Sequence, residues 1–168
     1  MVKLKVAIAL SAMIFPTFVF AQWVTKTDDD IFTGGKKATM IATIGEDSDS
    51  SALIFDCTKN NLVFSYIEKS SDPDKVSNIP VDMFVKVDSG DIIKTKSAFS
   101  QRNDQYIQAS ISDIDLVTEI LKESSKAKSK IIIGISNDII GQNSVSASMA
   151  GSGKAVGQFV SACEINIK

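Results

Sequence analysis

Apolar and β-branched residues occur in short runs along the first two thirds of the chain, and polar stretches separate these runs. In the clearest run, Val81, Met83, Val85 and Val87 occupy every second position, so they fall on one face of an extended strand. A period of two predicts antiparallel strands with one face in a core and the other in water. The predicted strands lie at 38–44, 52–57, 62–67, 81–87, 92–99 and 106–112.

Turn residues stand between consecutive runs. The Lys-Asn-Asn segment at 59–61 indicates a hairpin, because asparagine tolerates the left-handed backbone that a tight turn requires. The Asp-Ser-Gly segment at 88–90 and the polar residues 101–104 predict two further turns, and residues 72–80 form a longer polar loop. The runs therefore predict an antiparallel meander.

The period changes to that of a helix after this meander. Leu116, Val117, Ile120 and Leu121 recur at helical spacing, and Ser112 stands where it could cap the helix start. Two further extended stretches follow at 131–136 and 145–150. The pattern predicts one helix between two parts of the sheet.

A second helix is predicted at the end of the sequence, with Ser152 as its cap. Val156, Phe159, Val160 and Cys163 form one apolar stripe on it. The elements together predict an α+β fold, a mainly antiparallel β-sheet or sandwich with two helices.

The first residues have the pattern of a secretory signal peptide. Lys3 and Lys5 precede an uncharged apolar run that ends at Ala21, which is a small residue of the kind that a signal peptidase reads. We expect residues 1–21 to be the signal peptide and 22–168 to be a single exported, β-rich domain. No later stretch is long and apolar enough to predict a membrane span after cleavage.

Export changes the interpretation of the two cysteines. Cys57 and Cys163 both stand in apolar surroundings, and an even pair in an oxidising compartment indicates one structural disulfide. This bond would link the last helix to the strand at 52–57.

Composition argues against several classes of function. The formal net charge is −2, Arg102 is the single arginine, and the chain has no histidine. A basic stripe for nucleic acid is therefore absent from the sequence, and Ser-His-Asp or Cys-His catalysis is excluded. We expect no cofactor, no metal site and no catalytic residues.

Three motifs resemble parts of known binding or catalytic sites, but each lacks an element that the site requires. The segment GSGKAVGQF at 151–159 lacks the first glycine of a P-loop and has Ala155 where a hydroxyl would hold magnesium. The acidic segment 46–49 lacks the glycine and glutamate of an EF-hand loop. The Asp-Ser-Gly segment at 88–90 occurs once, whereas an aspartic protease needs two aspartates from two such segments. The same three residues are typical of an ordinary turn. All three are predicted to be structural.

In order along the chain, the sequence resembles the TagO/VasI family of periplasmic proteins associated with type VI secretion. The resemblance is carried by Trp23, the acidic segment 28–30, LIFDC, LVFSYIEK, VKVDSGDI, YIQASIS and the ending SMAGSGKAVGQFVSACEI. Exported proteins of the invasion-associated-locus-B type have a more distantly similar plan. Glu164 and Ile165 stand where the family commonly has an aromatic residue after the last cysteine.

The resemblance implies a non-catalytic accessory or interaction protein of the periplasm with an envelope protein as partner. The alternative is a periplasmic inhibitor or immunity protein against a toxin, a lysozyme or a phage component. Loops are the expected binding surface, because the apolar stripes are needed for the core. The candidate interaction residues are Asp28, Asp29, Asp30, Asp72 and Asp74, in segments 28–35 and 72–80.

Overall fold

The computed structural model describes residues 23–45, 50–139 and 141–167, which form one antiparallel sheet of nine strands and two α-helices. The strand order is β1-β2-β3-β4-β7-β6-β5-β8-β9. The expected signal peptide and the acidic segment 46–49 lie outside the described residues. The strands are β1 (Trp23–Asp30), β2 (Gly35–Thr43), β3 (Ser51–Thr58), β4 (Asn61–Lys69), β5 (Ile79–Val87), β6 (Ile93–Gln101), β7 (Tyr106–Ile111), β8 (Lys130–Asn137) and β9 (Gly141–Ser148).

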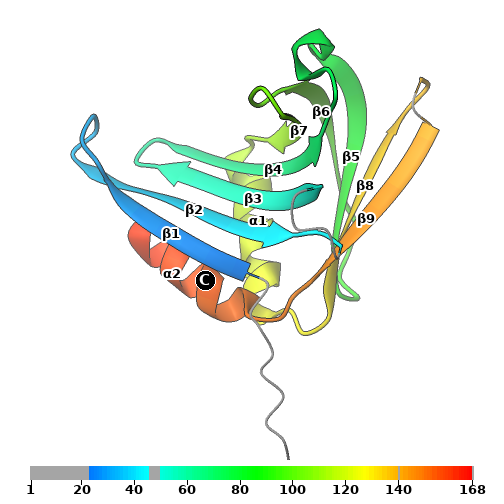
Figure 1. Cartoon of the computed structure of the whole chain (residues 1–168). Helices are drawn as coiled ribbons and strands as arrows, with labels where there is room; N and C mark the ends of the chain where they lie inside the picture. Colours follow the sequence, from blue (N-terminus) through cyan, green and yellow to red (C-terminus); the bar gives the residue numbers. More distant parts are fainter. Residues whose placement is uncertain (1–22, 46–49, 140, 168) are drawn as a thin grey trace, which may run out of the picture.

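The sheet curls strongly, so that the first and last strands splay apart (Figure 1). Each strand pairs with its neighbours in a register that places alternate residues on the concave face. One row across the sheet contains Ala42, Leu53, Tyr66, Ala109 and Phe99, all of which are buried. The period of two in the sequence therefore gives one main apolar face, and a smaller buried cluster of Ala52, Ile54 and Ile67 lies on the opposite face.

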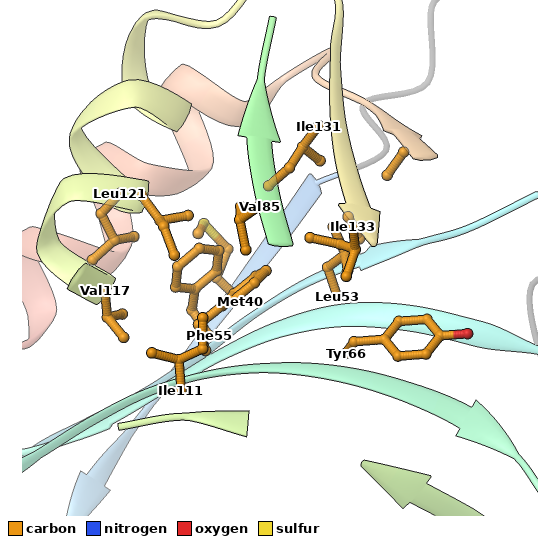
Figure 2. Packing of buried hydrophobic residues seen from close by; sticks show 14 of the residues in the cluster. Met40, Leu53, Phe55, Tyr66, Val85, Ile111, Val117, Leu121, Ile131 and Ile133 are labelled. Carbon is orange, nitrogen blue, oxygen red and sulfur yellow. The ribbon is translucent and has the colours of Figure 1, made fainter. Parts of the chain in front are cut away.

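Helices α1 (Ile114–Lys126) and α2 (Ser152–Ala162) pack against each other and against part of this concave face. Val117, Leu121 and Phe159 from the helices are fully buried. Phe55 of β3 packs against Phe159 with ring centroids 6.1 Å apart, and Figure 2 shows Phe55 among the buried residues of helix and sheet. Most of both predicted stripes is thus confirmed as the inner faces of the helices, whereas Cys163 lies just after α2 rather than on it.

Two hydrogen bonds join the first strand to the end of the chain. The Trp23 indole N–H donates to the carbonyl of Ser148, the last residue of β9, at 2.8 Å. The Thr25 hydroxyl donates to the carbonyl of Ala155 in α2, also at 2.8 Å. The two edges of the curled sheet therefore meet near Trp23 and diverge away from it (Figure 1).

The predicted disulfide is present between Cys57 on β3 and Cys163, which follows α2. The two Cα atoms are 6.3 Å apart, within the range that a disulfide spans. Cys57 is buried, whereas Cys163 is half-buried. The bond anchors the C-terminal helix to the sheet, and the α+β fold class is confirmed.

Both predicted helix caps are wrong by one residue. Asp113 caps α1, because its carboxylate accepts the backbone N–H groups of Asp115 and Leu116, while Ser112 lies outside the helix. Gly151 is the N-cap of α2 with φ of 85°, a left-handed conformation in which glycine costs little. The hydroxyl of Ser152 donates instead to the carbonyl of Ser124 in α1.

The first strand was not expected from the sequence pattern. Only Trp23 and Asp30 of β1 are buried, since the strand lies at the edge of the sheet and most of its residues face water. Such a strand has no apolar alternation. Within the described part of the chain, neither helix is long and apolar enough to cross a membrane.

Candidate functional site

The tip of the β1–β2 hairpin exposes two large apolar side chains. Ile31 is 84% and Phe32 is 91% accessible to solvent, although both are of types that usually pack inside. The hairpin extends away from the helices and the rest of the sheet (Figure 1). This combination of a projecting turn and bare apolar groups is typical of a protein contact site.

Asp30 holds the backbone of this tip in one conformation. Its carboxylate accepts the Thr33 hydroxyl at 2.7 Å and the backbone N–H of Phe32 at 3.1 Å. These hydrogen bonds, with the Thr33 hydroxyl foremost, lower the pKa of Asp30. The turn closes through a bond from the N–H of Gly34 to the carbonyl of Asp30. The Asp30 carboxylate is therefore engaged in hydrogen bonds within the turn, and Phe32 is the side chain that the tip exposes to solvent.

The other two candidate acids of this segment are paired with lysines. Asp29 accepts from Lys36 at 2.8 Å on the neighbouring strand, and this contact lowers the pKa of Asp29. Asp28 lies 3.3 Å from Lys26. All three acids belong to the end of strand β1 and not to a loop. Exposed pairs of this kind contribute little to stability.

The second candidate segment lies elsewhere on the molecule. Asp72 precedes the short 3-10 helix η1 (Pro73–Lys75) and accepts from Lys75 at 2.7 Å, which lowers its pKa. Asp74 is exposed within η1. Figure 1 shows this green turn before β5 at the top and the blue β1–β2 tip at the left. The structure does not bring the two sets of acids together.

The Asp-Ser-Gly turn has a structural role. The Asp88 carboxylate accepts three consecutive backbone N–H groups, from Lys128 at 2.7 Å, Ser129 at 3.0 Å and Lys130 at 2.8 Å. These bonds lower the pKa of Asp88, and they fix the connection from α1 into β8. The chain itself therefore occupies three of the about four acceptor positions of this carboxylate.

The glycine-rich segment also has a structural explanation. A side chain at Gly153 would place its Cβ 3.0 Å from the carbonyl oxygen of Ser125, so glycine permits the close approach of α2 to α1. Lys154, the residue that a P-loop would use, is exposed on α2. Within the residues that the structure describes, no cluster of three or more potential ligands could hold a metal ion.

A pocket opens on the concave face of the sheet in the part that the helices leave uncovered. Its volume is about 330 Å³, at the lower end of the range for small-molecule sites. Val76, after η1, contributes to one side. The apolar lining from the strands consists of Ile79, Phe99, Ile107, Ile133, Ile135 and Val145.

One polar pair lies in the wall of this pocket. The Tyr66 hydroxyl donates to Oε2 of Glu68 at 2.6 Å, and both residues come from the concave face of β4. Burial raises the pKa of Tyr66 far above its usual value, and the bond to Glu68 adds to this effect. The hydroxyl therefore remains a donor. Figure 2 shows the Tyr66 ring pointing away from the helix-side cluster.

Sequence reasoning missed this pocket because its residues come from six strands. Each lining residue has the pattern of an ordinary core position, and only the sheet curvature separates those that line a hollow from those covered by a helix. A weak signal was present in Glu68, a charged residue in phase with the buried Phe64 and Tyr66. The Ile31–Phe32 pair within a polar stretch was a similar signal for the hairpin tip.

Comparisons of the chain with family models, with curated proteins and with solved structures found no match.

Proposed function

We propose that this protein is exported to the periplasm and acts there by binding an envelope protein, as a non-catalytic accessory factor. The observation that carries the proposal is the β1–β2 tip, where Ile31 and Phe32 are almost fully exposed on a turn fixed by Asp30. A preformed turn loses little conformational entropy on binding, so its apolar side chains can contribute most of their burial energy.

The disulfide supports the exported location. Disulfides persist in oxidising compartments and are rare in the cytosol, and the Cys57–Cys163 bond joins residues 106 positions apart.

The resemblance to the TagO/VasI family makes the type VI secretion apparatus the first class of envelope partner to test. An inhibitor of a toxin or hydrolase is the second candidate, because a projecting rigid loop also fits an enzyme cleft.

Site-directed photocrosslinking in the native cells tests the binding surface. We expect a photoreactive phenylalanine analogue at position 32 to yield one discrete crosslinked partner. The same analogue at the exposed Ser89, in the β5–β6 turn, serves as the matched control and should yield none. Ile31→Ser should weaken the crosslink severalfold while changing the free energy of unfolding by less than about 0.5 kcal/mol, because Ile31 is exposed.

The identity of the crosslinked protein decides between the two candidates. A structural component of an envelope assembly supports the accessory role, and a toxin or a cell-wall hydrolase supports the inhibitor role. Equal crosslinking at positions 32 and 89, or none at position 32, would contradict the proposed surface.

A further inference from the structure

The pocket on the concave face has the composition of a ligand site distinct from the hairpin tip. Its apolar lining comes from strands β5 to β9 and from Val76 after η1, and its polar groups are few. Sites for small molecules combine an apolar wall with a small number of placed polar groups. The helices α1 and α2 pack on β1, β2, β4 and β5, and none of their residues is among those that line the pocket.

The charge of the pocket is negative. Among the described residues that line it, Glu68 is the only one with a charged side chain. The neighbouring Lys69 points to the opposite face of β4, since successive side chains of a strand alternate. On the η1 side, Asp72 forms an ion pair with Lys75, so this pair does not change the net charge near the pocket.

Glu68 also has unused capacity to accept hydrogen bonds. Oε2 accepts the Tyr66 hydroxyl, whereas Oε1 has no hydrogen-bond partner among the residues that the structure describes. An ionised carboxylate offers about four acceptor positions, so most of them remain available. Because Tyr66 is 4% exposed and donates to Oε2, it holds the carboxylate in place at the pocket wall.

We propose that this pocket binds a small amphiphile with a cationic amine head and an aliphatic body. The amine donates to Oε1 of Glu68, and the body lies against Phe99, Ile133 and Val145. An anionic head group, as in a fatty acid, would be repelled by Glu68 in a partly desolvated site. A neutral alcohol would gain the apolar contacts without a charge-assisted hydrogen bond.

Isothermal titration calorimetry with three probes of equal chain length tests the ligand class. We expect n-octylamine to bind the purified protein at pH 7 about tenfold or more tightly than octan-1-ol, because hydrogen bonds between charged groups are the stronger ones. Octanoate should bind more weakly than the alcohol. Each methylene removed from the amine should weaken binding about three- to fourfold, as expected for burial in an apolar wall.

Two variants locate the binding site. Glu68→Gln keeps an acceptor for Tyr66 and should reduce the preference for the amine over the alcohol to less than about threefold. Val145→Trp on edge strand β9 should fill the pocket and weaken the binding of amine and alcohol by about tenfold or more. Ser146→Trp, on the same strand with its exposed side chain on the opposite face, is the matched control and should bind as the wild type does.

The proposal would be overturned by octylamine binding no tighter than octanoate, or by an amine affinity that Val145→Trp leaves unchanged. Retention of the full amine preference in Glu68→Gln would also overturn it. Circular dichroism of each variant verifies that the fold is intact. The result is independent of the crosslinking at position 32, so either proposal can fail while the other stands.

Discussion

A few residues with special backbone or acceptor roles set the geometry of the connections. Asp88 has φ of 48°, a left-handed conformation that aspartate and asparagine tolerate better than most residues, and its carboxylate receives three N–H groups of the segment entering β8. Asp30 plays the same role on a smaller scale at the β1–β2 tip. In both places the carboxylate of an aspartate that resembles a binding group accepts hydrogen bonds from its own chain and thereby fixes a turn or connection.

Asp88→Asn tests the contribution of this charge to stability. The folded pKa of Asp88 is lowered by hydrogen bonds from the N–H groups of Lys128, Lys130 and Ser129, so its stabilising effect is present above the unfolded pKa near 3.8. The effect is lost as the pH falls through the folded pKa. We expect Asp88→Asn to lower the Tm at pH 7 and to show a smaller loss of Tm between pH 7 and pH 3 than the wild type.

Asp91→Asn, at an exposed position in the same turn, is the control and should retain the wild-type pH dependence. The role assigned to Asp88 would be refuted if Asp88→Asn and Asp91→Asn gave identical thermal melts at both pH values.

At the scale of elements, the sequence was most informative where one face is buried and the other is wet. The alternation of Val81, Met83, Val85 and Val87 predicted β5, and the helical stripes predicted α1 and α2, because each pattern has a period that only one backbone geometry satisfies. Strand β1 was not predicted, because it lies at the edge of the sheet, pairs with β2 on one side and carries mostly polar residues. The helix starts were misplaced because neighbouring residues of similar capping ability compete locally.

The packing of α2 on α1 can be tested with two glycines of the same helix. Gly153→Val should lower the free energy of unfolding by about 1–3 kcal/mol, because its Cβ would lie 3.0 Å from the Ser125 carbonyl oxygen and force the helices apart. Gly157→Val is the matched control. A Cβ there meets no atom within 4 Å, so the change should be within about 0.5 kcal/mol.

Chemical denaturation of the two variants provides the measurement. Equal stability of Gly153→Val and Gly157→Val would show that the close approach of the helices does not require a glycine at position 153.

At the scale of the whole molecule, the curled sheet leaves two edges unpaired along most of their length. Strands β1 and β9 form these edges, and both are largely polar, with Lys26 and three acids on β1. Polar and charged edges discourage pairing with other chains.

The pocket also depends on the arrangement of the whole molecule. Its position depends on which part of the concave face the helices cover, and no local pattern in the sequence specifies that.

The disulfide acts on the whole chain because it closes a loop across 106 positions. We expect Cys163→Ser to lower the free energy of unfolding by about 3–4 kcal/mol, since the bond restricts the unfolded chain. The double variant Cys57→Ala/Cys163→Ser should be destabilised by a similar amount, because both variants lose the same bond.

A reductant should lower the Tm of the wild type and leave that of the double variant unchanged. The stabilising role of the bond would be disproved if the wild type melted at the same temperature with and without reductant.

The hydrogen bond from Trp23 to Ser148 also gives the protein a built-in optical probe. Trp23 is the only tryptophan of the chain, it is 3% exposed, and its partner lies 125 positions away. Contacts between such distant positions form late when folding is limited by loop closure. The intrinsic fluorescence of the protein thus reports the moment at which the first strand meets the last, separately from the backbone signal of the individual strands and helices.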